Sequence, residues 1–385
     1  MKTIKENSIR ITEYNVADKL PDPFKFDDGT FVKSREDWEK RKKEIYKTAV
    51  ELQYGTQPPA PEVLSFEVLD ESYGSYRITA GTKERQVSFI MRALIPVGNG
   101  PRPNGPFPVI VDGDLCFKYA FLPDYVPTML ENGIAYVTFN RLELAPDRQD
   151  IGRKGPLYEV YPDKTFGAIG AWAWGYSRCV DVLEQLPFTD KNNIAFTGHS
   201  RGGKTAMLAG VMDERAAVVN PNETCAGACS CYRVSMKAVD ENGEEKESET
   251  LSSICERYPL WFGPELIKYA GTEGELPFDS HFLKALVAPR ILLEGEAASD
   301  IWANPVGSWQ TIMGAKEVFD FLDAGDNLIW YYRSGGHFHK GEDIENLVAV
   351  MKNRMYSSPL PEGFFTTPFK PMDRIFDWKA PDKKQ

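Results

Sequence analysis

The stretch NIAFTGHSRGGKTAMLAG, residues 193–210, decides the fold of this chain. Its first five residues have the apolar character of a short buried strand, and residues 204–214 have the pattern of a helix. Between them, GHSRG at 198–202 fits the G-x-S-x-G pattern, in which a serine sits on a sharp turn from a strand into a helix. Glycines permit so tight a turn, and the N-terminal end of the helix lies where an oxyanion would develop. The sequence therefore predicts that Ser200 is a nucleophile.

The chain around this motif alternates short apolar runs with helical stretches. Buried on both faces, such runs are typical of a parallel sheet covered by helices. Residues 63–96 instead alternate apolar and polar residues, as antiparallel strands do. We therefore predict an α/β-hydrolase fold, with a mostly parallel central sheet covered by helices on both faces and antiparallel strands at its N-terminal edge. The apolar runs are PVIVDG (108–113), GIAYVTFN (133–140), NIAFTGHS (193–200), AAVVNPNE (216–223), RILLEGEA (290–297) and NLIWYYRSGG (327–336).

The remaining segments suggest how the 385 residues are organised. Residues 1–60 are polar, with a helical stretch around 35–52, and are expected to form an N-terminal extension packed on the main domain. Residues 61–357 are expected to form the catalytic domain, with an insertion at about 232–279 that builds a lid or binding wall. Residues 358–385 are rich in proline and are expected to be an irregular C-terminal tail.

Composition excludes several functional classes. A net charge of -11 and a sequence pI near 5.1 leave no basic field for nucleic acid. We find no apolar stretch of about 18 residues that would span a membrane, and MKTIKENSIRITEYN at 1–15 lacks the apolar run of a secretory signal. The expectation is therefore a cytoplasmic protein that binds neither nucleic acid nor membranes. Nothing in the sequence indicates its oligomeric state.

The six cysteines are expected to be free thiols in a chain of this length. Cys225, Cys229 and Cys231 raise the alternative of a metal site, but the gaps between them match no common zinc spacing. We therefore expect neither a metal nor a cofactor.

A serine nucleophile in this fold needs a histidine base and an acid that follow it along the chain, each on a loop after a strand. His337 follows the strand-like run at 327–334 and a Gly-Gly pair, so it is the preferred base, with His339 as the alternative. His199 and His281 are expected to be structural. Glu223 and Asp300 both follow apolar strands, and the residue pattern does not choose between them as the acid that orients the imidazole.

Five motifs together resemble the glucuronoyl esterases of carbohydrate esterase family fifteen. They are GHSRGGK, NPNETCAGACSCYR, LPFDSHFLKALVAPR, SDIWANP and RSGGH, and the similarity spans roughly residues 108–351. The resemblance implies a serine esterase that splits esters of glucuronic acid on xylan-derived saccharides through an acyl-enzyme and without a metal. The expected partner is a small uronate ester or an oligosaccharide.

The resemblance also assigns roles to single residues. Arg201 adds its guanidinium to the oxyanion hole, and Lys204 contacts sugar hydroxyls. Glu249 hydrogen-bonds the uronate ring, and Trp302 lines its pocket, with Trp261 as a weaker candidate on the same wall. Family members use a glutamate at the Glu223 position or an aspartate at the Asp300 position, and on this basis Glu223 is preferred, with Asp300 as its substitute.

One departure from the fungal pattern indicates which branch of the family the chain resembles. Fungal members have a cysteine where His199 stands, and it forms a disulfide near the catalytic histidine, so this sequence is similar to the bacterial branch. Two other functions remain open. One is an acetyl (xylan) esterase on the same fold, and the other is a non-catalytic hydrolase relative that binds uronates.

Overall fold

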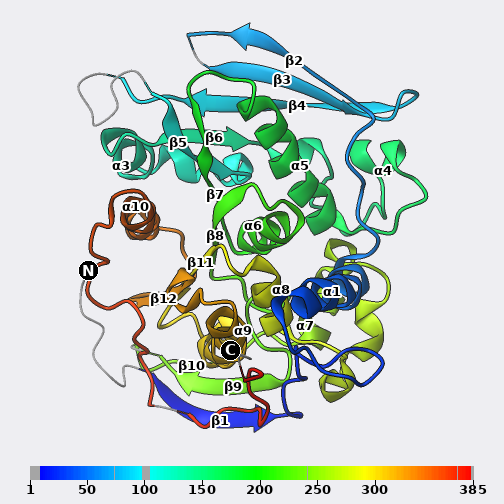
Figure 1. The fold of residues 1–385 in the computed structure, drawn as a ribbon, viewed down its shortest axis with the longest axis vertical. Helices are drawn as coiled ribbons and strands as arrows, with labels where there is room; N and C mark the ends of the chain where they lie inside the picture. The colour runs from blue at the N-terminus through cyan, green and yellow to red at the C-terminus, as the bar shows by residue number, and fades with distance from the viewer. Residues whose placement is uncertain (1–8, 73, 98–104, 241, 371, 383–385) are drawn as a thin grey trace.

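The computed structural model describes residues 9–72, 74–97, 105–240, 242–370 and 372–382. Within these ranges, the main sheet has nine strands in the order β12-β11-β8-β7-β5-β6-β4-β3-β2 (Figure 1). Neighbouring strands from β12 to β6 are parallel, whereas β4 pairs antiparallel with β6 and continues into an antiparallel meander. This is the mixed sheet that the apolar runs and the alternating residues 63–96 predict. The strands are β2 (Val63–Asp70), β3 (Ser75–Gly81), β4 (Gln86–Leu94), β5 (Phe107–Asp112), β6 (Ala135–Phe139), β7 (Thr189–His199), β8 (Ala216–Asn222), β11 (Ile291–Ala297) and β12 (Leu328–Arg333).

Helices cover both faces of this sheet. On one face lie α5 (Ala168–Leu183), α6 (Arg201–Met212) and α8 (Ser280–Val287), and on the other lie α3 (Tyr125–Glu131) and α10 (Gly341–Tyr356) (Figure 1). The smaller of the two apolar cores joins α3 and α10 to the sheet through side chains such as Met129 and Leu347. Among the described residues, no helix is both long and apolar enough to span a bilayer.

The order of the strands determines where the site forms. Four neighbouring parallel strands, β7, β8, β11 and β12, end just before Ser200, Glu223, Asp300 and His337 respectively. Because parallel strands end at the same edge of a sheet, the loops that carry these four side chains lie side by side. The helix α9 (Pro305–Phe321) follows the Asp300 loop and packs against α8.

The insertion and the start of the chain share a second sheet. Strand β1 (Arg10–Val16) pairs antiparallel with β9 (Val234–Val239), which also pairs with β10 (Glu245–Glu247). The sequence did not predict β1, because its side chains are mostly exposed and carry no apolar face. The insertion continues into α7 (Leu251–Arg257) and short 3-10 turns.

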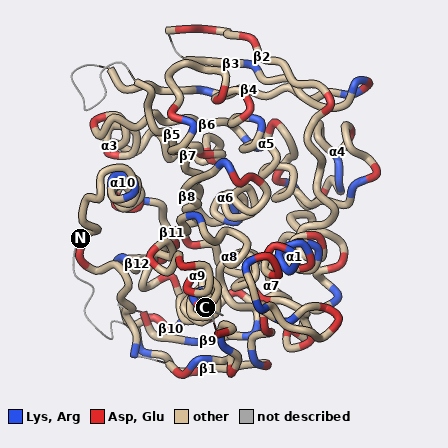
Figure 2. The backbone as a smooth tube through the Cα atoms, viewed as in Figure 1, with Lys and Arg blue, Asp and Glu red and all other residues tan. Residues whose placement is uncertain are grey.

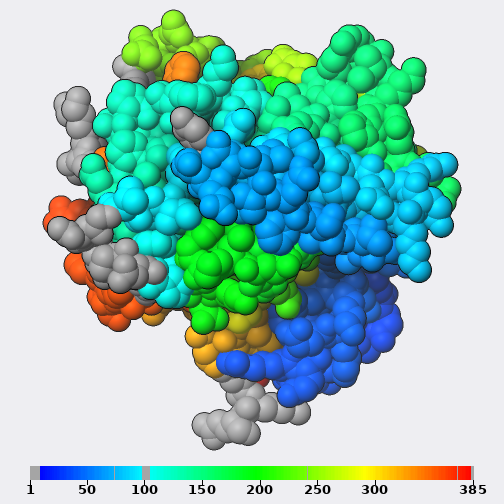
Figure 3. All heavy atoms as spheres, turned by 90° about the horizontal axis from the view of Figure 1, so that it is seen from above, coloured from blue at the N-terminus to red at the C-terminus, as the bar shows by residue number. Residues whose placement is uncertain are grey.

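The rest of the N-terminal extension forms a helical segment over the expected range. It begins as α1 (Arg35–Ile45), passes through a π-helical turn (Tyr46–Glu51) and ends in α2 (Leu52–Tyr54). Charges of both signs crowd α1, while Trp38 and Ile45 are buried (Figure 2). In Figure 3 the extension, in dark blue, packs against the body. Residues 1–8 of the expected extension lie outside the described residues, as do 371 and 383–385 of the tail; the described tail residues form no helix or strand.

His281 connects the extension to the main body. Its ring is fully buried on α8, Nε2 donates to the carbonyl of Pro21 at 2.8 Å, and the ring stacks on Trp378 of the tail. Burial lowers the pKa of His281 from 6.5 to about 4, so the ring stays neutral in the folded protein. The expected structural role of His281 is consistent with these contacts.

This histidine gives a prediction for stability against pH. Between pH 6.5 and about 4 the unfolded chain binds a proton at His281 that the folded protein does not, so stability falls as the pH is lowered. The contribution at the acidic end is on the order of 3 kcal/mol. In His281→Gln, which keeps a donor for Pro21 but cannot titrate, urea unfolding at pH 7.5 and pH 4.5 is expected to show a smaller loss. An equal loss in both proteins would contradict a neutral buried ring.

Candidate active site

Ser200 sits at the turn that the motif predicts. Strand β7 ends at His199 and α6 begins at Arg201, and Ser200 between them has φ 57° and ψ -121°. A non-glycine residue rarely adopts this conformation, and it is typical of a strained nucleophile turn. The close packing explains the neighbouring glycines: a Cβ at Gly198 would collide with the Gly202 carbonyl, and one at Gly202 with the Asp114 carboxylate.

His337 bridges the serine and an acid. Its Nε2 lies 2.9 Å from Ser200 Oγ, and its Nδ1 lies 2.6 Å from Asp300 Oδ2. An ionised carboxylate only accepts hydrogen bonds, so Asp300 places the ring proton on Nδ1 and leaves Nε2 free to accept the serine proton. Asp300 is buried, whereas the His337 side chain is 36% exposed, so the imidazole remains accessible from the surface.

Glu223, the preferred acid at the level of sequence, has a different partner. Its Oε2 lies 3.6 Å from His337 Nδ1, which is too far for a hydrogen bond, and its Oε1 accepts from the Arg333 guanidinium. Arg333, at the end of β12, is fully buried and also donates to Asp343 at 2.8 Å and to the Phe338 carbonyl. Arg333 thus holds Glu223, and Asp300 makes the contact with the imidazole, so the geometry favours Asp300 over Glu223 as the acid, and this assignment stays a prediction.

The other two histidines of this region lie behind the triad. The His339 ring is buried, with Nε2 3.1 Å from Tyr125 Oη and Nδ1 3.3 Å from Asp343, so it does not reach Ser200. The His199 ring centroid lies 4.7 Å from that of His337, and burial lowers the pKa of His199 well below its usual value. His199 therefore contacts the base as a neutral ring.

The Arg201 side chain lies in an aromatic setting beside the nucleophile. Its guanidinium carbon is 4.7 Å from the ring centroid of Trp261 and 5.4 Å from those of Phe117 and Tyr258. One guanidinium nitrogen, Nη1, donates to Asp147 Oδ2 at 2.6 Å. The side chain keeps 26% of its surface exposed, so a substrate can contact it. Sequence reasoning identified Arg201 but missed Asp147, which belongs to no motif.

The three residues expected to bind the sugar differ in exposure. Lys204 is buried, and its ammonium donates to the Thr224 carbonyl and lies 5.6 Å from the Trp261 ring centroid. Glu249 is also buried, and its Oε2 has no hydrogen-bond partner among the described residues. Burial raises the pKa of Glu249, although the neighbouring Lys204 ammonium opposes the shift.

Trp302 lies at the outer end of this group. Its carbonyl accepts from the Glu249 backbone N–H at 3.0 Å, and its ring lies 4.8 Å from the Arg257 guanidinium carbon. It lines two surface hollows of about 300 and 460 Å³, both of which also contain Lys237 and Glu247. Trp302 therefore lies at a polar part of the surface and not in the core.

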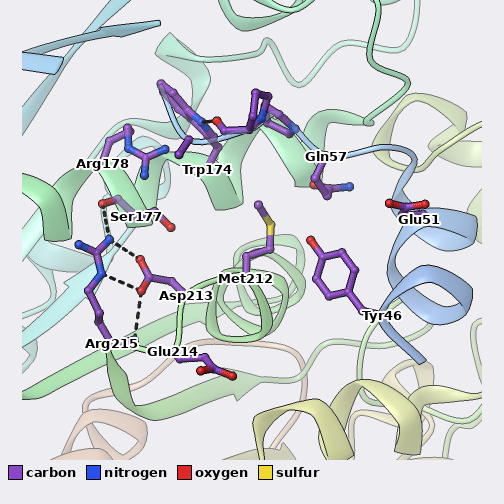
Figure 4. A pocket seen from close by; sticks show the side chains of 13 residues that line it. Tyr46, Glu51, Gln57, Trp174, Ser177, Arg178, Met212, Asp213, Glu214 and Arg215 are labelled. Carbon is purple, nitrogen blue, oxygen red and sulfur yellow. Dashed lines mark hydrogen bonds and ion pairs between the residues drawn. The ribbon is translucent and has the colours of Figure 1, made fainter. Parts of the chain in front are cut away.

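A different hollow, of about 410 Å³, lies at the other end of α6 from Ser200 (Figure 4). Tyr46 of the extension, Trp174 of α5 and Met212 of α6 contribute to its lining, and Arg215 and Asp213 pair beside them. None of the candidate catalytic residues lines it. We assign it no role in the chemistry.

All six cysteines are free thiols. Among the described residues, two groups of three side chains lie close enough together to hold a metal ion. They are His199 with Glu223 and His337, and Cys225 with Asp300 and His337. Both surround the triad, and neither brings Cys229 or Cys231 to Cys225.

Comparisons with known proteins find similarity to one family of esterases. The family model for "Glucuronyl esterase, fungi" matches residues 78–323. A 4-O-methyl-glucuronoyl methylesterase 1 from Wolfiporia cocos is 33% identical over 330 residues, which cover 84% of this chain and 76% of the relative.

Solved structures extend the match to the fold. A carbohydrate esterase family 15 glucuronoyl esterase from Caldicellulosiruptor kristjansonii superposes with a TM-score of 0.85 at 30% identity, covering 94% of this chain and 97% of that one. A glucuronoyl esterase from Sporotrichum thermophile, in complex with methyl 4-O-methyl-β-D-glucopyranuronate, has a TM-score of 0.76 at 24% identity and covers 97% and 95%. The predicted α/β-hydrolase fold is confirmed.

Proposed function

This chain belongs to the glucuronoyl esterases, and from that premise we propose that it hydrolyses esters of 4-O-methyl-glucuronic acid by acyl transfer to Ser200. The family inferred from the five motifs is confirmed, and with it the class of carboxylic ester hydrolase. The observation that carries the catalytic assignment is the hydrogen-bonded row Ser200, His337 and Asp300 on a strained strand-to-helix turn. Membership of the bacterial branch rests on His199 and stays a prediction.

The expected cytoplasmic location is corrected by the same relatives. The matched methylesterases are extracellular enzymes of plant cell-wall breakdown. The expectation relied on the lack of an apolar leader in the printed sequence. A leader is removed from a mature secreted chain, so its absence does not report a location.

In the first step, His337 Nε2 takes the proton from Ser200 Oγ as the oxygen attacks the C6 carbonyl carbon of the uronate. Asp300 stabilises the imidazolium that results. The imidazolium then gives its proton to the departing alcohol, and the C6 acyl group stays on Ser200. In the second step, His337 takes a proton from water, the hydroxide attacks the acyl carbon, and the acid is released as Ser200 regains its proton.

Negative charge develops on the carbonyl oxygen in both steps. The backbone N–H of the residue after the nucleophile, Arg201, is the usual donor to it in this fold. We assign the Arg201 guanidinium as a second donor, because it lies beside Ser200 with part of its surface open. A cation that is already in place stabilises the tetrahedral state without reorganisation.

We assign the binding of the saccharide part of the substrate to Glu249, Lys204 and Trp302. The Oε2 atom of Glu249, which has no hydrogen-bond partner among the residues that the structure describes, accepts from a sugar hydroxyl. Lys204 donates to a second hydroxyl, and Trp302 contacts the sugar C–H surface. A saccharide that extends beyond the uronate, such as a xylan-derived oligosaccharide, continues past Trp302.

The purified protein is expected to hydrolyse benzyl glucuronate and to leave acetylated xylose derivatives almost untouched. Only the uronate ester places a sugar ring on the acyl side of the bond, where its hydroxyls can meet Glu249 and Lys204. Preferential release of acetate would reject the glucuronoyl assignment in favour of an acetyl esterase. Failure of a serine-directed phosphonate to label the protein would indicate a non-catalytic uronate-binding relative.

Replacing Arg201 with alanine is expected to lower kcat on benzyl glucuronate by about 10²–10³, which is the usual loss for one oxyanion donor. KM should change little, because the guanidinium interacts with charge that develops only in the transition state. Steady-state kinetics check both quantities. A large rise in KM with kcat preserved would place Arg201 in ground-state binding instead.

A further inference from the structure

Asp147 connects three segments that are far apart in sequence. It lies beyond β6 and the turn Arg141–Glu143, and its side chain is 13% exposed. One carboxylate oxygen, Oδ2, accepts from Arg201 Nη1 at 2.6 Å, and the other, Oδ1, accepts from Trp261 Nε1 at 2.7 Å. One oxygen thus contacts Arg201 at the start of α6, and the other contacts Trp261 in the insertion.

The aromatic neighbours of Arg201 hold its guanidinium close to the insertion but do not determine the direction in which its N–H groups point. Trp261 and Tyr258 stack on each other with centroids 3.8 Å apart and planes 2° from parallel. Aromatic faces attract a guanidinium over a broad area, so they leave it free to turn and slide. Among the described residues, Asp147 is the only ion-pair partner of Arg201, and the Arg201 Nε has no hydrogen-bond partner. A directional contact to the guanidinium therefore comes from Asp147 alone within that set.

We propose that Asp147 is a positioning residue that aims the Arg201 guanidinium at the developing oxyanion. This inference rests on the proposed role of Arg201. A charge-assisted bond at one end of a planar, forked cation restricts the direction of its remaining N–H groups. The same carboxylate also accepts from the Trp261 indole, against which the guanidinium packs. Asp147 therefore determines both the position and the orientation of the cation. Loss of this aim should lower kcat and leave KM nearly unchanged, because the substrate ground state carries no oxyanion.

Asp147→Asn is the most informative variant. An amide offers one acceptor atom and one donor group, so it cannot accept from both Arg201 and Trp261. On benzyl glucuronate, kcat is expected to fall about 10- to 50-fold, less than the full loss of an oxyanion donor. Asp147→Glu keeps the charge and both acceptors one methylene further out, and its kcat is expected to lie above that of Asp147→Asn. A matched control is Asp150→Asn, because Asp150 is exposed and, within the described part of the chain, its ion pair is with Arg148 in the same loop.

A double-mutant cycle with Arg201→Ala separates positioning from general damage to the fold. If Asp147 acts through Arg201, Asp147→Asn changes kcat by less than about twofold once Arg201 is alanine. The same fall in both backgrounds overturns the proposal, as does full kcat in Asp147→Asn when Arg201→Ala alone is impaired. Full activity in Arg201→Ala would instead reject the role of Arg201 itself. Thermal unfolding of each variant shows whether it is folded, and if Asp147→Asn is not, the comparison of Asp147→Glu in the two backgrounds gives the same decision.

Discussion

Replacing Ser200 with alanine is expected to lower kcat on benzyl glucuronate by about 10⁵–10⁶. The hydroxyl is the atom that forms the acyl bond, and His337 has no other serine oxygen in hydrogen-bond contact in the described part of the chain. The remaining activity would come from the oxyanion donors and from substrate binding. Single-turnover measurements with excess enzyme check for any residual burst of alcohol.

The fold should survive this change, because Ser200 makes its structural contact through the backbone. Its N–H donates to the Asn222 carbonyl at 2.9 Å, and alanine keeps that bond. Calorimetry should therefore show that the variant binds a glucuronate with the same affinity as the wild-type protein. Hydrolysis at the wild-type rate would reject the nucleophile, whereas loss of binding together with activity would point to a damaged fold.

Replacing Asp300 with asparagine is expected to give the second largest effect, a fall in kcat of about 10⁴. An amide at this position can donate to His337 Nδ1, which favours the tautomer with its proton on Nε2. That tautomer cannot accept the serine proton. Steady-state rates on benzyl glucuronate across pH test this, because the loss should persist at every pH at which the enzyme is folded.

Glu223→Gln is the matched comparison, and its kcat should fall far less. Glu223 does not reach the imidazole by hydrogen bond, and its nearest partner is Arg333. Removing one partner of a buried ion pair destabilises a protein by about 3–5 kcal/mol, so the main loss in this variant is expected in urea unfolding. If Glu223→Gln were the slower enzyme and Asp300→Asn the faster, the acid would be Glu223 after all.

The parts of the site that the sequence predicted are those encoded locally. The turn at Ser200 is recognisable because strand, glycines and helix are contiguous, and His337 because it follows a strand and two glycines. The choice of acid was not local. Glu223 and Asp300 follow adjacent parallel strands and reach the same edge of the sheet, so pattern alone ranks them equally. What separates them is Arg333, which lies 110 residues from Glu223 and resembles an ordinary strand-end arginine in sequence.

Asp147 and β1 were missed for related reasons. Asp147 has partners 54 and 114 residues away, and an isolated loop aspartate gives no signal of either contact. Strand β1 owes its existence to a partner in the insertion, since its side chains bury too little apolar surface to produce an alternating pattern. Tertiary pairing overrides weak local preference in such edge segments.

The pairing of β1 with β9 has a consequence for how this enzyme can be re-engineered. Residue 248, one before Glu249, bonds back to Met236 in β9, and β9 is held on its other edge by residues 10–16. Strand β1 is therefore connected through β9 to the segment that carries Glu249, which we propose binds the sugar. We therefore expect removal of β1 to change substrate preference before it changes the contacts among Ser200, His337 and Asp300.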